Sequence, residues 1–365
     1  MGAITSQCST INPSSKLAAL VSPVCKLFNT RIAFASFEGA VVCILLHPHR
    51  NFEDDAPGVH GQPFLVADPV GILRQLDHVR ERVGSIDIGW LVAAALMFAL
   101  SNVLGAAQWG WLLRLSGAGL PFRRVLSFYW VGLFFSNLLP ANVGGDVIRV
   151  VDVSRSTGSR RAAVGATLLD RLLGFVAIAL LALLALPLLP RGTVGPWLFG
   201  VVLAFSAATL FLSLTIFVRG LFAPLERLFG GIRVFDIGRR LTAVADELHA
   251  YRRHPASLLQ LFSLAVLVQV MRIGVHLMMA KSLGIRLSPV YFFVIVPILA
   301  IVVVLPISVA GLGVRESAAV GLFGHVGLSP SDAVAHQLAT FLICLAINMI
   351  GGILFVARSF GGAGA

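Results

Sequence analysis

Long apolar runs dominate the pattern of hydrophobic and polar positions along this chain. A run of about 18 or more apolar residues is long enough to cross a ~30 Å hydrocarbon core as a helix. Six runs reach that length: residues 88–113, 162–189, 194–218, 258–280, 290–310 and 334–357. A weaker run near residues 32–46 is interrupted by Glu38. The pattern predicts an all-α, polytopic membrane protein with about six to eight transmembrane helices.

The composition agrees with a membrane protein. Hydrophobic residues make up 57% of the 365 and charged residues 12%, and the mean hydropathy is +0.90. An ordinary soluble domain carries about 25% charged residues. The net charge of +11 comes from arginines in the loops between runs, which is the usual orientation signal of membrane proteins and argues against nucleic acid as a partner. The four cysteines have neither metal-ligand nor disulfide spacing, so we expect no metal and no cofactor.

The predicted runs divide the chain into a membrane domain and less regular flanks. Residues 1–84 form a poorly defined N-terminal region, and residues 358–365 form a short tail. The membrane domain, 85–357, comprises a first half at about 85–218, a second half at about 256–357, and a basic loop between them at 219–255 whose apolar spacing predicts an amphipathic helix.

One apolar run breaks in an unusual way at "LLPANVGGDVIRV", residues 138–150. The apolar arm before it, 125–139, is only fifteen residues long and ends at Pro140, which disfavours continued helix. Asp146 is a good N-cap for a new short helix that carries Arg149 in its first turn. These features predict a re-entrant hairpin. Irregular backbone is tolerated at membrane depth only where protein or water surrounds it, so the break also implies a cavity.

A similar motif returns 166 residues later. "LPISVAGLGVRE" begins at Leu305, as "LPANVGGDVIR" begins at Leu139. Leu, Val and Gly are abundant in the chain, so a chance match is an alternative. Taken as an internal repeat, two corresponding breaks indicate a transporter-like binding site near the bilayer midplane.

The distribution of arginines predicts that the two halves are inverted. If 125–150 is re-entrant, the basic loops 114–124, 149–161 and 219–255 all lie on one face, which the positive-inside rule makes cytoplasmic. Three crossings then separate the two breaks, so the second hairpin opens from the opposite face.

Several ionisable residues lie inside the apolar runs, where each is costly and therefore a candidate for function. Asp170 and Arg171 are adjacent in one run, and Arg272 lies near the centre of another, on one helical face with Gln269 and His276.

Two interpretations of these charges remain open. They form structural pairs, with Asp170 joined to Arg171 or Arg149 and Arg272 joined to Glu316 or extended toward the interface. Alternatively, the arginines bind an anion beneath the two helix N-termini, since both the helix dipole and the guanidinium group favour phosphate.

Three blocks resemble a known family: "FFSNLLPANVGGDVIRV" (134–150), "LLDRLLGF" (168–175) and "LPISVAGLGVRE" (305–316). Over about residues 70–357, the chain resembles the flippase-like, lysylphosphatidylglycerol synthase transmembrane-domain family. The resemblance implies a multi-pass protein of the bacterial cytoplasmic membrane that moves lipids with large polar heads, such as aminoacylated phosphatidylglycerol or polyprenyl-linked sugars. The positions that match its motifs are Pro140, Gly144, Gly145, Asp146, Arg149, Asp170, Arg171, Gly311, Gly313, Arg315 and Glu316.

Two features depart from the family pattern. Full-length aminoacyl-lipid synthases continue into a large soluble catalytic domain, whereas only eight residues follow Ala357 here, so we expect no synthase activity. The family often has Arg before Trp where this chain has Gln108-Trp109.

We therefore predict a protein that flips a lipid with an anionic or large polar head group and is not an enzyme. Its partners would be membrane lipids and lipid-biosynthesis enzymes. The alternatives are a non-transporting scaffold or accessory protein of a lipid or cell-envelope pathway, and a membrane-embedded head-group transferase with Asp146 as base. The predicted head-group site comprises Asn142, Gly144, Gly145, Asp146, Arg149, Asp170, Arg171, Arg272, Arg315 and Glu316. The predicted hinges at the breaks are Pro140, Pro306, Gly311 and Gly313. An Arg-to-Gln change at a phosphate contact should abolish transfer and leave folding intact.

Overall fold

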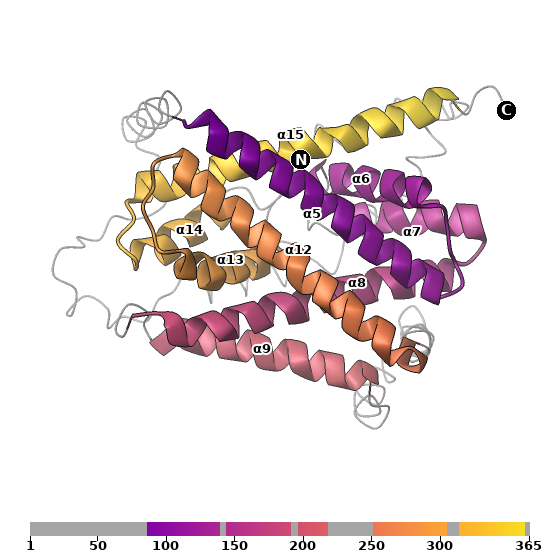
Figure 1. Cartoon of the computed structure of the whole chain (residues 1–365), viewed down its shortest axis with the longest axis horizontal. Coiled ribbons are helices and arrows are strands. Elements are labelled where there is room, and N and C mark those ends of the chain that lie inside the picture. The colour runs from indigo at the N-terminus through magenta and orange to yellow at the C-terminus, as the bar shows by residue number, and fades with distance from the viewer. Residues whose placement is uncertain (1–85, 139–143, 191–195, 218–250, 305–313, 362–365) are drawn as a thin grey trace, which may run out of the picture. The chain divides into compact units, whose positions relative to one another are not determined.

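A computed structural model describes residues 86–138, 144–190, 196–217, 251–304 and 314–361. The regular elements in these ranges are all helical, which confirms the predicted all-α class (Figure 1). The α-helices are α5 (Ile88–Leu115), α6 (Phe122–Leu138), α7 (Gly144–Thr157), α8 (Arg160–Ala185), α9 (Pro196–Phe217), α12 (Pro255–Ser282), α13 (Pro289–Val304), α14 (Val314–Gly324) and α15 (Pro330–Gly361). Short 3-10 turns follow α8 (η1, Leu186–Leu188) and precede α12 (η3, Tyr251–Arg253).

Some predictions fall outside the described residues. These are the weak run at 32–46, all but the last residues of the 219–255 loop, and the break residues Pro140, Asn142, Pro306, Gly311 and Gly313.

Four of the described helices are long and apolar enough to cross a membrane: Ile88–Leu115, Arg160–Leu188, Pro255–Ser282 and Pro330–Arg358. They correspond to four of the six predicted spans. The other two predicted spans coincide with α9 and α13, whose described apolar stretches are shorter, at Phe199–Phe211 and Pro289–Val303. The protein is therefore a helical membrane protein with several spans.

The long first helix of each half ends in the same way. A glycine with positive φ follows α5 (Gly117, 77°) and α12 (Gly284, 69°), a conformation that favours glycine just after a helix. Proline then marks the start of the next helix, since Pro121 precedes α6 and Pro289 is the first residue of α13. In both halves, therefore, a glycine with positive φ follows the first long helix and a proline stands at the start of the next helix.

Both predicted breaks separate two short helices that pack against each other. α6 packs on α7 around the first break, and α13 packs on α14 around the second. Gly145 permits the α6–α7 contact, because a Cβ there would collide with the carbonyl oxygen of Gly132 on α6. Each half therefore has the order long helix, two packed short helices, long helix.

One detail of the first break differs from the prediction. α7 already begins at Gly144, so Asp146 is its third residue and not its N-cap, and Arg149 lies in the second turn. The reason is that the Asp146 carboxylate binds Arg149 and Arg171 instead of capping the helix.

Apart from α9, which packs on α8 and has no counterpart among the described helices of the second half, the helix contacts of the two halves correspond pair by pair. Within each half the same neighbours pack: α5 with α6 and α8, as α12 with α13 and α15, and α7 with α8, as α14 with α15. The contacts between halves are reciprocal as well. α6 packs on α15 while α13 packs on α8, and α5 packs on α15 while α12 packs on α8.

The most extensive contact between the halves is that of α5 with α12, which run side by side in Figure 1. They are antiparallel. The amide of Asp87, before α5, donates to the carbonyl of Ser282 at the end of α12 at 2.9 Å. At the other end, the Tyr251 hydroxyl donates to the carbonyl of Leu112 at 3.2 Å.

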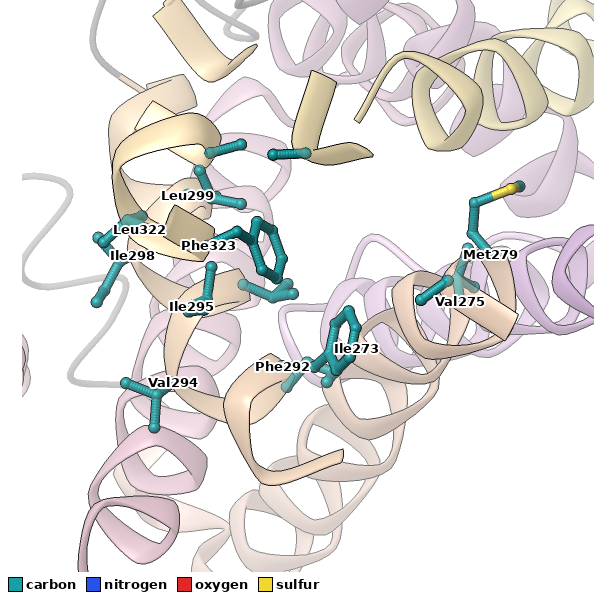
Figure 2. Close-up of a cluster of buried hydrophobic side chains, with 14 of the residues drawn as sticks. Ile273, Val275, Met279, Phe292, Val294, Ile295, Ile298, Leu299, Leu322 and Phe323 are labelled. Carbon is teal, nitrogen blue, oxygen red and sulfur yellow. The ribbon is translucent and has the colours of Figure 1, made fainter. Parts of the chain in front are cut away.

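Two apolar clusters fill the interior, and each surrounds one pair of short helices. The first comprises buried side chains of α5, α6, α8 and α12, among them Trp109, Tyr129 and Leu169. The second lies around α13 and α14, where Phe292 lies beside Ile273 of α12 and Phe323 beside Ile295 and Leu299 (Figure 2). Polar side chains lie between these clusters and form the site described next.

Candidate functional site

A cavity of about 370 Å³ lies among the membrane helices of both halves. The first half contributes residues of α5, α6, α8 and α9, and the second half contributes residues of α12, α13, α14 and α15. The polar side chains that line it are Gln108, Tyr129, Asn137, Asp170, Arg171, Gln269, Arg272, His276, Arg315, Gln337, Thr340 and Asn348. Four of the predicted site residues are among them: Asp170, Arg171, Arg272 and Arg315.

Arg171 and Asp146 form a two-bond ion pair between α8 and α7. Arg171 Nε donates to Asp146 Oδ2 at 2.7 Å, and its Nη2 donates to Oδ1 at 2.9 Å. The side chain of Arg171 is 41% exposed in the protein, while that of Asp146 is 18% exposed. Both carboxylate oxygens of Asp146 therefore bind Arg171. Arg171 also lines the cavity.

Arg149 is buried on the other side of Asp146 and binds it through Nη2. Its guanidinium lies over the rings of Trp109 and Tyr129, with its central carbon 5.1 and 4.8 Å from the ring centroids. Such contacts are favourable for a desolvated cation. Its Nη1 lies 3.9 Å from Asp170 Oδ2. Among the described residues, Arg149 does not line the cavity, whereas its neighbour Tyr129 does.

Asp170 has a second partner in addition to Arg149. Gln108 of α5 donates through Nε2 to Asp170 Oδ1 at 2.9 Å. The position at which the family often has arginine thus holds a neutral amide that binds this carboxylate. Next to it, Trp109 donates to the hydroxyl of Thr167 at 3.1 Å, so α5 and α8 are held together by two polar contacts.

Arg272 differs from the other arginines of the site because none of its hydrogen bonds or ion pairs among the described residues is to a carboxylate. Its Nη2 lies 3.5 Å from the Tyr129 hydroxyl, and its Nε is buried with no partner among the described residues. Gln269 and His276, predicted on the same face of α12, also line the cavity. Gln269 donates to the carbonyl of Gly174 at 3.0 Å and so ties α12 to α8.

Arg315 occupies the position in the second motif that matches Arg149 in the first. It also lies over an aromatic ring, with its guanidinium carbon 4.7 Å from the centroid of Phe341, and it also binds an acidic neighbour, Glu316, at 2.9 Å. Unlike Arg149 it lines the cavity, and its Nε is buried without a partner in the part of the chain that the structure describes.

Two histidines lie beside the site. His336 is 1% exposed, and its Nε2 is 2.9 Å from the carbonyl oxygen of His276. Its ring packs against those of His276, Phe292 and Phe323 at centroid distances of 5.5 to 5.8 Å. No group of three or more His, Cys, Asp or Glu side chains in the described ranges is arranged to hold a metal ion.

Sequence reasoning missed most of the neutral lining, namely Tyr129, Asn137, Gln337, Thr340 and Asn348. The signal was available for the amides, because a carboxamide within an apolar run is also unfavourable in lipid and tends to face protein or water. Gln337, for example, is 1% exposed and its Nε2 has no partner among the described residues.

These features define a class: a polytopic helical membrane protein with an arginine-lined cavity among its membrane helices. The chain belongs to the family described as the lysylphosphatidylglycerol synthase TM region, whose model matches residues 65–352. It is also similar to the UPF0104 membrane protein PH1989 of Pyrococcus horikoshii, with 28% identity over 102 residues. That match covers 27% of this chain and 30% of the relative.

Proposed function

We propose that this protein translocates a lipid with an anionic or large polar head group across the cytoplasmic membrane, without chemically changing it. The observation that carries the proposal is the polar cavity among the membrane helices, lined by Arg171, Arg272 and Arg315. Guanidinium groups bind phosphate oxygens with strong, charge-assisted hydrogen bonds. A head group held there would be shielded from hydrocarbon while its acyl chains remain in the bilayer.

We further propose that the two halves are inverted repeats and that α6–α7 and α13–α14 are re-entrant hairpins. The reciprocal helix contacts and the antiparallel pair α5 and α12 support this arrangement. Inverted repeats around a midplane site are the usual basis of alternating access. In this mechanism each hairpin opens the cavity to one face in turn, and the arginine-rich loops lie in the cytoplasm.

The proposal is tested by reconstitution of the purified full-length protein. Proteoliposomes containing acyl-labelled NBD-phosphatidylglycerol are treated with dithionite, which bleaches only the outer leaflet. If the protein moves the lipid, the inner-leaflet label should be bleached faster in proteoliposomes than in protein-free liposomes. Mass spectrometry should recover the lipid unchanged. A scaffold would give bleaching at the protein-free rate, and a head-group transferase would give a lipid of altered mass.

Variants connect the activity to the cavity. Arg272→Gln and Arg315→Gln each remove a charged hydrogen-bond donor, worth about 1.5–3 kcal/mol, which corresponds to a loss of roughly 10- to 150-fold in head-group binding. Arg124→Gln makes the same change at an exposed residue at the start of α6 and should keep wild-type transport. If both cavity variants transport as well as Arg124→Gln, the site assignment is wrong.

A further inference from the structure

The charge balance of the site narrows the class of lipid that it accepts. Seven side chains that are charged at pH 7, with histidine counted as neutral, line the cavity or pair with the charged residues that line it, in the described part of the chain. Four are cationic, Arg149, Arg171, Arg272 and Arg315, and three are anionic, Asp146, Asp170 and Glu316. The two breaks, residues 139–143 and 305–313, contain no ionisable side chain and do not change this count. The set therefore carries one net positive charge.

That excess charge can be assigned to one residue. Arg171 is paired with Asp146, Arg315 with Glu316, and Arg149 lies between Asp146 and Asp170. Arg272 remains. Its Nη2 contacts the neutral Tyr129 hydroxyl, and its buried Nε has no partner among the described residues. Arg272 has only the distant field of Asp170, which Arg149 and Arg171 share, to balance its charge. A buried charge without a partner of its own is very unfavourable near the middle of a membrane helix, and one ligand anion beside it would balance the set.

A cationic head group would find no free anion in this cavity. Asp170 is the one carboxylate among the described lining residues. Its two oxygens already face Gln108 and Arg149. A dianionic phosphate would bring two negative charges to a set with one net positive charge, so one negative charge would remain unbalanced.

The rest of the lining suits uncharged hydroxyl groups. Asn137, Gln269, Gln337, Thr340 and Asn348 offer both donors and acceptors without charge. Two of the amide atoms around the cavity are buried without partners in the described part of the chain: Gln337 Nε2, a donor, and Gln108 Oε1, an acceptor. Hydroxyl groups of a ligand can satisfy both, since a hydroxyl donates and accepts.

On the basis of the proposed function, we propose that the site selects a phosphodiester lipid with a single negative charge and an uncharged, hydroxyl-bearing head, such as glycerol or a sugar. It discriminates against lipids with a cationic aminoacyl head and against phosphomonoester or diphosphate lipids. Arg272 holds the phosphodiester, and the amides hold the head group.

Lipid binding to the purified full-length protein in detergent tests this selectivity. Displacement of NBD-phosphatidylglycerol is followed by fluorescence anisotropy, with three unlabelled competitors: phosphatidylglycerol, lysyl-phosphatidylglycerol and phosphatidic acid. We expect phosphatidylglycerol to displace the probe at a concentration at least tenfold lower than either of the others. Equal displacement by all three, stronger displacement by lysyl-phosphatidylglycerol or phosphatidic acid, or no binding of the probe would overturn the proposal.

A variant reverses the preference if the charge argument is correct. Gln337→Glu is nearly isosteric, places a carboxylate in the cavity and brings the net charge of the set to zero. It should weaken the binding of phosphatidylglycerol and strengthen the binding of lysyl-phosphatidylglycerol, so that the ratio of the two affinities changes at least tenfold. Arg124→Glu changes an exposed charge and should leave the ratio as in wild type. If Gln337→Glu does not fold, Arg272→Gln takes its place. It removes one positive charge, which also brings the net charge of the set to zero, and it should abolish the preference for phosphatidylglycerol. A preference unchanged in the folded variants contradicts the inference.

Binding and transport can fail separately. A protein that binds phosphatidylglycerol selectively but does not move it would refute the proposed translocation and keep the inferred selectivity. A protein that moves lysyl-phosphatidylglycerol in preference would keep the translocation and refute the selectivity.

Discussion

Replacement of Arg149 by glutamine should destabilise the protein far more than the same change at Arg171. The Arg149 side chain is 4% exposed, lies over Trp109 and Tyr129, and faces both Asp146 and Asp170. Removal of one partner of a buried ion pair costs about 3–5 kcal/mol, because the other charge is left unbalanced. Arg171 is 41% exposed, so loss of its pair with Asp146 should cost about 1 kcal/mol or less.

The assay is unfolding of the purified proteins in detergent, followed by intrinsic tryptophan fluorescence. We expect Arg149→Gln to unfold at a clearly lower temperature than Arg171→Gln, which should stay close to wild type. The double variant Arg149→Gln/Asp170→Asn replaces both charges by amides, leaves the Asp146–Arg171 pair intact and should recover more than half of the loss, since neutral replacement of a whole buried pair costs little. If Arg149→Gln is as stable as Arg171→Gln, or if the double variant is no better than the single one, the structural role given to Arg149 is refuted.

Two further predictions concern helix packing and helix ends. Gly351 of α15 faces the backbone of Trp130 on α6, where a Cβ would lie 2.6 Å from the carbonyl carbon, so Gly351→Ala should lower stability by about 1–3 kcal/mol through overpacking. Gly200 of α9 is exposed and a Cβ there would meet open space, so Gly200→Ala should raise stability by up to about 1 kcal/mol. Thermal unfolding in detergent compares the two variants. Equal unfolding midpoints would contradict the close contact between Gly351 and Trp130. Asp87 accepts from the amides of Gly89 and Trp90 at 2.8 and 3.3 Å, so Asp87→Ala should cost about 1 kcal/mol and speed amide exchange in the first turn of α5, whereas Asp87→Asn should not.

Much of the fold could be predicted because apolar length is a local signal. The run at 258–280 corresponds to α12, which extends to Pro255 and Ser282 because proline can occupy the first turn and Gly284 allows the chain to turn after the last. The order of the two halves also followed from their shared motif. The start of α7 was placed three residues late, at 147, because Asp146 was taken as a cap and its carboxylate instead binds two arginines.

The site could be predicted only in part. A charge within an apolar run is visible in the sequence, and Asp170, Arg171 and Arg272 were found in that way. Their partners depend on distances between helices, which no local pattern contains. As structural pairs, Asp170 was expected to join Arg171 or Arg149. In the structure Asp170 lies 3.9 Å from Arg149, while Arg171 binds Asp146 on α7 at 2.7 Å. Successive residues of a helix point in different directions, so adjacent side chains are poorly placed to meet.

The reciprocal contacts between halves have a consequence for biogenesis. α6 is held by α15, and the Ser127 hydroxyl near its start accepts a hydrogen bond from Arg358 at 2.9 Å, across 231 residues of chain. Asn102 on α5 likewise meets Asn348 at 3.4 Å across 246 residues. Ser127 and Asn102 therefore meet these partners only after α15 has been synthesised. During insertion, α5 and α6 lie in the bilayer with these polar groups unpaired. If the ribosome stalls before α15, the released chain keeps them unpaired, and we expect membrane quality-control proteases to degrade it.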